Sequence, residues 1–420
     1  MAPVKTSAAS AKKADRQYVD KASPVGTEGA SKLQWLRSGR SKEFEVLVPP
    51  ATLTMRDIQS QIPKHFFNRS IGWSSFYVAR DLVQVAVTMY VMMYFGEPAI
   101  AAVDSLVAGM SLGAAVTSVA YWLTRAIVWN AFWFVQGLNG TGIWVMAHEC
   151  GHQAFSPWRS VNDAVGLVLH SAVLVPYHSW RITHGNHHKH TSHLTKDTVF
   201  IPSKEESILK EIIEESPIVS LFWMVITFTI GWPGYILWNA AGQDYGRFAT
   251  HFDPRSPQFR SDEYNDVIIS DLGIFAVLAA IGAAIYNFGF LTVWCYYLAP
   301  YMWVNFWLVF ITYLQHTDIR LPHYTADEWN FVRGALCTID RDFGAPLNWW
   351  LHHINDSHVV HHIFSQMPFY NAIQVTRTVL PDIIGEMHQT SKRTLWSSLW
   401  ESWVECRYVV PKDGVAVYHK

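Results

Sequence analysis

The chain has 420 residues, of which 50% are hydrophobic and 15% aromatic, while only 16% carry a charge. Charged residues make up about 25% of ordinary soluble domains, so this deficit indicates a membrane protein. The formal net charge of −2 argues against nucleic acid as a partner, because proteins that bind nucleic acid carry a basic surplus.

The chain divides into two polar tails and one long apolar region. Residues 1–50 begin with "MAPVKTSAASAKKADRQYVDKAS", which lacks the apolar core of a secretory signal; we predict a disordered cytosolic tail there. Residues 51–410 are predicted to form one membrane domain and residues 411–420 a C-terminal tail. The four cysteines form no C-x-x-C pair, so we expect no disulfide framework and a reducing compartment for the functional face.

The first half of the domain contains two long apolar runs. Residues 53–67 are amphipathic and predicted to lie on the membrane surface. A membrane span requires about 20 apolar residues, which residues 82–103 supply, and the next run covers 106–147. We expect spans at 82–103 and 126–147, with a separate packing helix on the lumenal side over 106–123.

Further apolar runs follow towards the C-terminus. Residues 164–177 are too short for a simple span and are expected to dip into the membrane or lie flat on it. Residues 218–238 contain "GWPG" at 231–234, and Gly and Pro disfavour helix interiors, so we place this run in the membrane interface. The runs 267–290 and 291–316 are expected to span.

Three short histidine clusters lie beside these runs: "HECGH" at 148–152, "HGNHH" at 184–188 and "HVVHH" at 358–362. Residues three or four apart share a face of a helix, so each cluster presents its imidazoles to one side. Neutral imidazole is the commonest metal-ligand side chain. We therefore predict one metal centre with eight histidine ligands: His148, His152, His184, His187, His188, His358, His361 and His362.

The number of imidazoles indicates two metal ions. Zinc sites are usually tetrahedral, so eight ligands exceed the needs of one zinc, although imidazole alone does not choose among Zn, Cu, Fe and Ni. "HECGH" also matches the H-E-x-x-H motif of zinc proteases, but that motif leaves the other two clusters unexplained. A shared centre requires an even number of membrane crossings between His190 and His358, which is a second reason to place 218–238 in the interface.

The clusters and the strings around them resemble the integral-membrane fatty-acyl desaturases, and in particular the oleate desaturase branch with its fungal, oomycete and algal members. The similar strings include "HECGHQAFSP" (148–157), "HSWRITHGNHHKHT" (178–191), "ITYLQHTDIRLPHY" (311–324) and "EWNFVRGALCTIDRDFG" (328–344). The resemblance covers roughly residues 50–410. It implies an all-α integral membrane protein with about four transmembrane helices, interfacial helices, and a cytosolic helical cap that carries a histidine-rich di-iron site.

The resemblance also implies the cofactor and the reaction. The eight cluster histidines would be metal ligands and catalytic residues for two non-haem iron ions, on the cytosolic face of the endoplasmic reticulum membrane. In acyl-CoA desaturases of known structure a further histidine, with an asparagine four residues before it, completes the centre. His316 is the matching candidate here, with Thr312 in the asparagine's place. Dioxygen would be the co-substrate, an acyl-phospholipid or acyl-CoA the substrate, and cytochrome b5 with NADH-cytochrome b5 reductase the source of electrons.

Acidic residues near the clusters are candidates for orienting the imidazoles. Glu149, Asp197 and Asp356 could each accept a hydrogen bond from the second ring nitrogen of a ligand. Asp356 could also cap the helix that carries His358. The charged residues at 340–342 are expected to form a solvated ion network.

Several functions remain open at this point. The leading hypothesis is desaturation of oleoyl to linoleoyl chains at the Δ12 position. The alternatives on the same scaffold are an ω-3 (Δ15) or bifunctional desaturase, a hydroxylase and an acetylenase. A membrane metal transporter or a haem-binding protein is the alternative of a different class. A transporter would hold its ligands inside spans near the midplane, and a haem requires one or two axial histidines, so neither accounts for three clusters that flank the spans.

Overall fold

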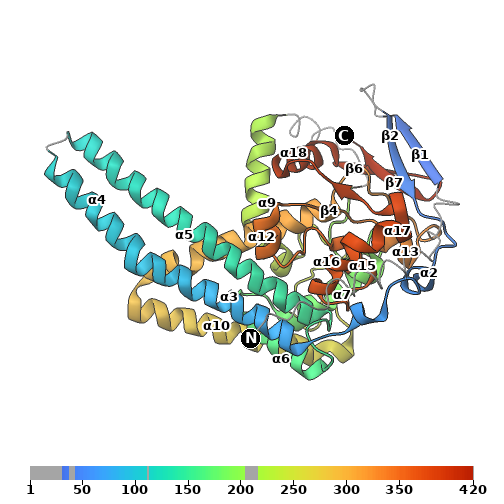
Figure 1. Ribbon diagram of the computed structural model, residues 1–420, viewed down its shortest axis with the longest axis horizontal. Coiled ribbons are helices and arrows are strands. Elements are labelled where there is room, and N and C mark those ends of the chain that lie inside the picture. Colours follow the sequence, from blue (N-terminus) through green and yellow to red (C-terminus); the bar gives the residue numbers. More distant parts are fainter. Residues whose placement is uncertain (1–30, 37–42, 111–112, 204–215, 420) are drawn as a thin grey trace, which may run out of the picture.

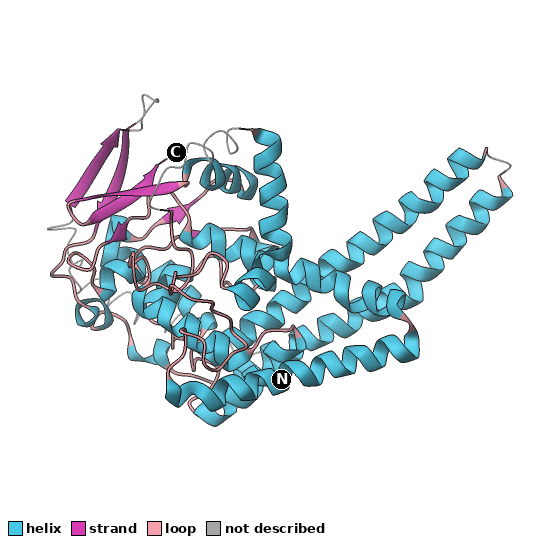
Figure 2. Cartoon of the chain, turned by 180° about the vertical axis from the view of Figure 1, so that it is seen from behind, coloured by secondary structure: helices cyan, strands magenta, loops and turns pink. Residues whose placement is uncertain are grey.

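The structure, a computed structural model, describes residues 31–36, 43–110, 113–203 and 216–419, and most of these are helical (Figure 1, Figure 2). The long helices are α3 Ile71–Val91, α4 Glu97–Gly109, α5 Ala114–Gly151, α6 Arg159–Ala172, α7 Tyr177–His190, α9 Pro217–Trp238, α10 Tyr264–Phe288 and α12 Ala299–His316. The predicted helical membrane fold is confirmed by these elements.

The longest feature is a helical hairpin that projects from the body of the molecule (Figure 1). α3 continues through a π-helical turn, Met92–Gly96, into α4, and α5 returns beside them. Arg125 and Asp104 form an ion pair of 2.6 Å between the two arms. The prediction of a separate packing helix over 106–123 is therefore wrong. The 38 residues of α5 contain no proline to interrupt them, and the two arms of the hairpin end at Gly109 and begin again at Ala114 instead.

Both π-helical turns in the described part of the bundle precede a proline. Met92–Gly96 precedes Pro98, and Trp294–Leu298 precedes Pro300 in the segment that joins α11, Phe290–Val293, to α12. Proline cannot donate to the carbonyl four residues before it, and its ring crowds that carbonyl. A locally widened turn relieves the crowding, so each long helix continues past its proline.

Four described helical segments are long and apolar enough to cross a membrane: Ile71–Gly109, Pro217–Trp238, Ser261–Phe288 and Phe290–His316. Three of them contain the predicted spans 82–103, 267–290 and 291–316 in whole or in large part. α5, which carries the span expected at 126–147, is not among them. Its C-terminal half is buried by protein, and that half includes polar residues such as Gln136, Asn139 and Thr141.

One of two further apolar runs differs from the pattern expected for it. α9 is one continuous helix with Pro233 inside it, and it is long and apolar enough to cross a membrane, so the helix-breaking argument that placed 218–238 in the interface is wrong. A Cβ on Gly231 would meet Val309 of α12 only at ordinary contact distance, so the packing of α9 on α12 does not require a glycine there. As expected, the run at 164–177 contains no spanning helix: it covers the end of α6, a helix of 14 residues, the turn that follows, and Tyr177 at the start of α7.

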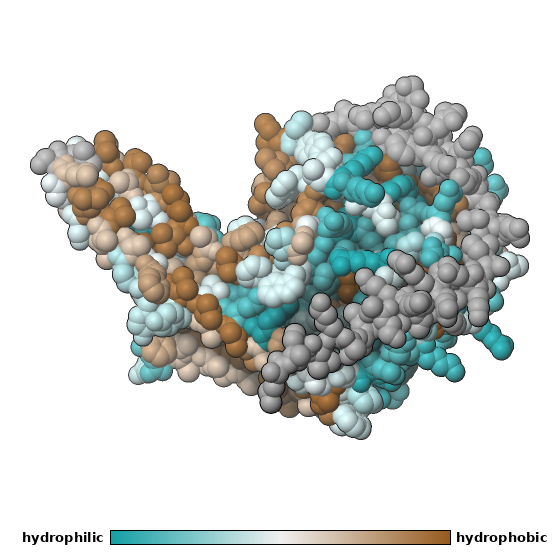
Figure 3. All heavy atoms as spheres, in the orientation of Figure 1, coloured by the Kyte–Doolittle hydropathy of each residue, from teal (hydrophilic) through white to brown (hydrophobic). Residues whose placement is uncertain are grey.

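Short elements form a cap over one end of the bundle (Figure 1). The helical ones are α2 Met55–Gln59, η1 Lys64–Phe67, η3 Ser261–Glu263, α13 Phe331–Ala335, α14 Ala345–Trp350, α15 His358–Ile363, α16 Phe369–Thr378, α17 Leu380–Ile384, η5 Gly385–Met387 and α18 Leu395–Glu405. Figure 3 shows apolar residues along the projecting hairpin and α9, while hydrophilic residues gather over the cap. This division is the one expected of a membrane bundle with an aqueous cap.

Small sheets lie at the edge of the cap (Figure 2). β1 Ser31–Leu36 and β2 Glu43–Val48 are antiparallel, β4 Asp340–Arg341 and β5 Thr390–Ser391 are parallel, and β3 His323–Tyr324, β7 Val415–His419 and β6 Tyr408–Lys412 form a sheet in the order β3-β7-β6.

Both predicted tails are therefore too long. Residues 31–36 and 43–48 pair as strands, and Val46 and Val48 are buried, so the disordered tail expected over 1–50 does not extend that far. Residues 1–30 lie outside the described residues. At the other end the last residues of β6 together with β7 occupy most of the tail expected at 411–420, where Val415 and Val417 bury their side chains.

Candidate metal centre

Four helices bring nine histidines to the junction of bundle and cap. α5 supplies two of them at its C-terminal end, α7 supplies three, α12 supplies its last residue, and α15 supplies three. In chain order they are His148, His152, His184, His187, His188, His316, His358, His361 and His362. The structure thus brings together all three predicted clusters and the additional histidine suggested by resemblance.

Five of these histidines form the first group. Each offers one ring nitrogen, and these nitrogens all lie within 4.8 Å of one another. The members are His148, His152, His184, His188 and His361. Two pairs come from a separation of four residues on α5 and α7, which confirms the shared helix faces expected from the spacing.

The second group contains His187, His316 and His362, whose ligand atoms also lie within 4.8 Å of one another. His358 adjoins this group, since its Nε2 is 3.1 Å from Nε2 of His316. The two groups are neighbours, because the rings of His188 and His362 stack with their centroids 4.0 Å apart. The arrangement offers two adjacent positions for metal ions.

Local sequence explains how α15 presents its imidazoles. In "HVVHHI" the apolar residues Val359, Val360 and Ile363 are buried in the core of the cap together with α16 and α17. The remaining three positions of this short helix are its histidines, which face the other helices of the centre. Burial of the apolar residues therefore fixes the direction of the metal-facing side.

Burial keeps these imidazoles in the state that binds metal. Burial, together with the neighbouring imidazoles, holds the pKa values of His184, His188 and His362 well below the ordinary value, and the pKa of His361 falls to about 3. Among the described residues, Nε2 of His152, His361 and His362 is buried without a hydrogen-bond partner. Converging, neutral and unpaired ring nitrogens fit a metal centre, because a metal ion would satisfy them.

Comparison with known proteins decides the family. The sequence profile described as fatty acid desaturase matches residues 126–393 of this chain. The chain belongs to the fatty acid desaturase family. It is therefore an oxidoreductase, and the helical membrane bundle with histidine groups able to hold metal is the arrangement expected of that family.

Individual relatives place the enzyme near the Δ12 branch. It is 44% identical over 384 residues to a Delta(12) fatty acid desaturase of Mortierella alpina, with 87% of this chain and 90% of the relative covered. It is 40% identical over 368 residues to a Delta(12)-acyl-lipid-desaturase of Punica granatum, with 87% and 88% covered. An oleate hydroxylase of Claviceps purpurea is 37% identical over 391 residues, with 85% and 78% covered.

Two predicted acidic residues lie beside ligand candidates. Oδ1 of Asp197 accepts from Nδ1 of His187 at 2.7 Å, which leaves Nε2 of that ring for a metal. Oε2 of Glu149 accepts instead from the backbone N–H of Phe369 at 3.0 Å, and its Oε1 is 3.9 Å from Nδ1 of His148, too far for a hydrogen bond. Burial raises the pKa of Glu149 to about 8.

The third predicted acid has other partners. Asp356 accepts from Nδ1 of His353 at 3.0 Å and from Arg377 at 2.9 Å, so the prediction that it orients His358 is wrong. The cause is that a turn lies between Asp356 and α15, which begins at His358. Thr312, which replaces the asparagine of the resemblance, donates to the backbone carbonyl of Leu308 at 2.8 Å, within its own helix.

A cavity of about 520 Å³ with a largely apolar lining reaches the histidines. Five of them line it: His148, His184, His187, His316 and His358. α5, α9 and α12 supply an apolar wall that includes Trp144, Val145, Trp232, Leu308 and Ile311. Ligand cavities in proteins measure about 300–1,000 Å³, so this one can hold a substantial apolar substrate against the histidines.

Sequence reasoning missed the opposite wall of this cavity. It is formed by residues 199–203 and by Cys406, Arg407 and Tyr418 near the C-terminus. The backbone N–H of Val409 in β6 donates to the carbonyl of Ser203 at 2.8 Å, so the C-terminal hairpin also holds the 199–203 segment in place. The β-branched and aromatic residues of "VAVYH" at 415–419 were the available signal for this strand.

Proposed function

We propose that this enzyme introduces the Δ12 double bond into a lipid-linked oleoyl chain and so forms a linoleoyl chain. Two methylene groups lose one hydrogen each, and dioxygen takes up these two hydrogens, two electrons from a donor protein and two protons from water and leaves as two molecules of water. The observation that carries the proposal is an apolar cavity whose wall includes histidines from both metal-binding groups. The Δ12 position rests on relatives of that name at 44% and 40% identity.

The nine histidines would hold two iron ions, one in each group. When bound, the ions supply the oxidising power towards an unactivated methylene that no side chain possesses. The imidazoles are neutral ligands, and Asp197 fixes the ring orientation and tautomer of His187. Iron is proposed over the other metals that suit imidazole because the reaction consumes dioxygen.

The cavity wall positions the substrate and excludes water. Burial of an acyl chain is worth roughly 0.8 kcal/mol per methylene, so the wall can bind the chain without polar contacts along its length. Successive methylenes of the chain are chemically alike, and only the geometry of the cavity can select the pair beside the histidines. The carrier of the chain is an acyl-phospholipid or an acyl-CoA.

Electrons must come from another protein. The sequence contains no dinucleotide-binding glycine motif and no cysteine pattern for an iron–sulfur cluster. We propose cytochrome b5, reduced by NADH-cytochrome b5 reductase, at the cytosolic face of the endoplasmic reticulum membrane. Lys189 and Lys196 are exposed on either side of the end of α7, next to the second histidine cluster, and could attract an acidic donor.

Expression in yeast with fatty-acid analysis tests the proposal. The expected result is linoleate formed from oleate, and loss of that product in His361→Ala. His190→Ala is the matched control, because His190 lies on α7 outside both groups and its Nδ1 bonds to the carbonyl of Asn186 at 3.1 Å. A product formed only from supplied linoleate would identify an ω-3 desaturase. Formation of both linoleate and its ω-3 product would identify a bifunctional desaturase.

A hydroxylated or acetylenic product would assign one of the other activities, and the relative named oleate hydroxylase makes the first of these a specific alternative. Elemental analysis of the purified protein tests the class of the protein. Two irons per chain without a haem absorption band agree with the proposal, whereas a haem band or no bound metal refutes it.

A further inference from the structure

Residues 338–341, which we name the bracket, lie between the two helices that supply most of the second histidine group. They are Thr338, Ile339, Asp340 and Arg341. The sequence suggested a solvated ion network at 340–342. The structure shows instead that Asp340 is 5% exposed and Arg341 2% exposed, so the bracket is part of the interior.

On one side the bracket binds the end of α12, where His316 is the last residue. The hydroxyl of Thr338 and the backbone N–H of Ile339 donate to the carbonyl of Gln315, at 2.9 and 3.2 Å. Nε of Arg341 donates to the carbonyl of Leu314 at 2.6 Å. The last carbonyls of a helix have no partner within the helix, so these bonds fix the end of α12 and with it the position of His316.

On the other side the bracket binds the start of α15. Oδ1 of Asp340 accepts from the backbone N–H of Val359 at 2.9 Å, in the first turn of that helix. The backbone N–H of Arg341 donates to the carbonyl of Asn355 at 2.8 Å, just before the helix. His388 donates from Nε2 to Oδ2 of Asp340 at 2.7 Å and so fixes the second oxygen of the carboxylate.

We propose that Asp340 is a positioning residue for the second metal ion, acting through the register of α15 against α12. This inference rests on the proposed di-metal function. Its geometric basis is that the bracket joins the two helices whose histidines, His316 and His358, approach to 3.1 Å between their Nε2 atoms. Asp340 touches neither histidine, so it acts only by holding the helix that carries the ligands.

The two groups depend on α15 to different degrees. The first group takes one of its five histidines, His361, from α15. The second group of three takes His362 from α15, and His358 of the same helix adjoins it. A shift of α15 therefore leaves four ligands in place at the first position but only His187 and His316 at the second. Loss of Asp340 should release the second ion and keep the first.

Metal binding by purified full-length protein in detergent tests this inference. Wild type, Asp340→Ala, Asp340→Asn and the control Asp342→Asn are loaded with ferrous iron without oxygen, and bound iron and the melting temperature are measured. Asp342 is an exposed neighbour whose side chain accepts from Gly344 and Asn348 and reaches neither α12 nor α15. Loss of an indirect partner of a metal site typically lowers metal affinity about 10- to 100-fold.

We expect Asp340→Ala to hold about half the iron of wild type and to lose part of the iron-induced rise in melting temperature. Asp340→Asn should recover most of the iron, since its Oδ1 can still accept from Val359 and His388 can change tautomer. Asp342→Asn should match wild type. If Asp340→Ala does not fold, His388→Ala replaces it and should weaken the second ion about tenfold.

Two results are distinguishable. Wild-type affinity for two ions in the folded variant, Asp340→Ala or else His388→Ala, overturns the role of Asp340 and leaves the di-metal proposal intact. A wild-type chain that binds no iron at all refutes the di-metal proposal itself.

Discussion

Replacement of Asp197 by asparagine gives the sharpest test of how the second group is oriented. Oδ1 of Asp197 accepts from Nδ1 of His187 and from the backbone N–H of Thr198, both at 2.7 Å, and Oδ2 accepts from the backbone N–H of Ser192 at 2.8 Å. An asparagine has one acceptor oxygen where the aspartate has two. Either His187 or Ser192 must therefore lose its hydrogen bond to this side chain.

Either orientation of the amide carries a cost. If the amide oxygen stays towards His187, the NH₂ group faces the N–H of Ser192 and two donors meet. If the amide turns, Nδ1 of His187 must accept, and the ring proton moves to Nε2, the nitrogen that lies 3.4 Å from Nε2 of His316 in the second group. We expect iron affinity at that group to fall about 10- to 100-fold, or about 1.4–2.7 kcal/mol.

The alanine variant would be less informative. It leaves three buried donors unpaired at about 1–3 kcal/mol each, a total comparable with the entire stability of a domain, about 5–15 kcal/mol. The assay is therefore iron content and melting temperature of Asp197→Asn in detergent. The control is Asp244→Asn, an exposed aspartate that accepts only from the backbone of Gly246. Wild-type iron affinity in Asp197→Asn would show that the carboxylate does not set the tautomer of His187.

Three further outcomes are expected. Tyr418→Ala should widen the cavity and change the ratio of C16 to C18 products by roughly tenfold, since one methylene in an apolar pocket is worth about 1–3 kcal/mol. The control Val410→Ala, on the exposed side of β6, should leave the fatty-acid profile unchanged. Asp81→Ala should lower the free energy of unfolding by about 3–5 kcal/mol in thermal melts, because it strips His352 of a buried partner at 2.6 Å; a loss below about 1 kcal/mol contradicts this. Burial lowers the pKa of His251 to about 3, so the contribution of this neutral imidazole to folding stability is complete above the ordinary histidine pKa near 6.5 and declines below it by about 1.4 kcal/mol per pH unit. His251→Gln should make the fall of the melting temperature between pH 6.5 and 4 less steep, and an unchanged slope refutes the buried neutral state of His251.

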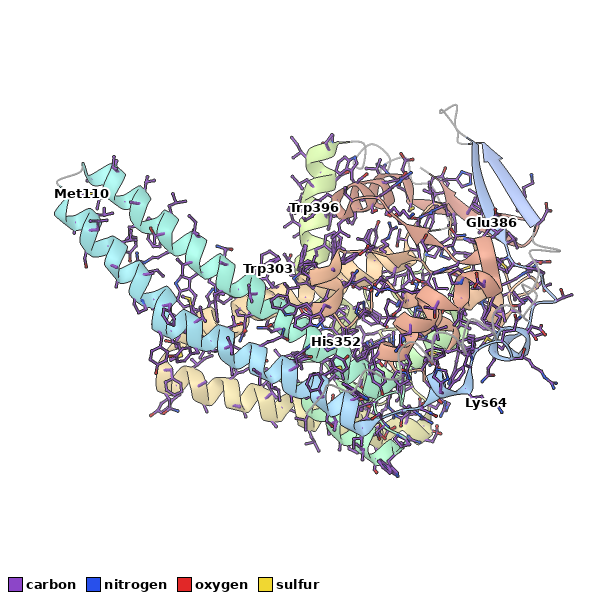
Figure 4. The ribbon with its side chains drawn as sticks, in the orientation of Figure 1. Lys64, Met110, Trp303, His352, Glu386 and Trp396 are labelled. Atoms are coloured by element: carbon purple, nitrogen blue, oxygen red, sulfur yellow. The ribbon has the colours of Figure 1, made fainter. Side chains whose placement is uncertain are left out.

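The position of His352 shows how the bundle and the cap are joined. It lies at the base of the cap, where Figure 4 labels it, and its Nε2 is 2.6 Å from Oδ2 of Asp81 in α3. Its backbone is left-handed, with φ of 52°, a conformation that a non-glycine residue adopts at a cost. The buried contact with Asp81 offsets that cost, so the pair fixes the loop before α15 against the membrane helices.

The sequence predicted those parts of the molecule that depend on local spacing. Histidines at separations of three and four residues share helix faces, and His148 with His152 and His184 with His188 do meet within the first group. The C-terminal hairpin also had a local signal that was not used. Asp413 and Gly414 both have positive φ, 51° and 81°, and Asp-Gly between two runs rich in β-branched residues indicates a two-residue hairpin turn.

Contacts between distant segments left no comparable signal. The partners of Asp340 are Val359 and His388, 19 and 48 positions away, and no periodicity links such residues. Asp356 was placed beside His358 because they are two positions apart, yet Asp356 precedes α15, which begins at His358, and its carboxylate meets His353 and Arg377 instead. The sequence does not distinguish one aspartate of a polar stretch from another. Only the packing of the folded chain determines which aspartate binds a helix and which one faces solvent.

This difference between local and distant contacts also separates the two metal positions. The first group draws four of its five histidines from two long helices, α5 and α7, where the helix repeat alone fixes the distance within each pair. The second group draws its three histidines from α7, α12 and α15, so no helix repeat sets any of its distances. Those distances exist only when the cap is docked on α12. The second position is therefore the one that depends on the bracket, although both groups are built from the same side chain.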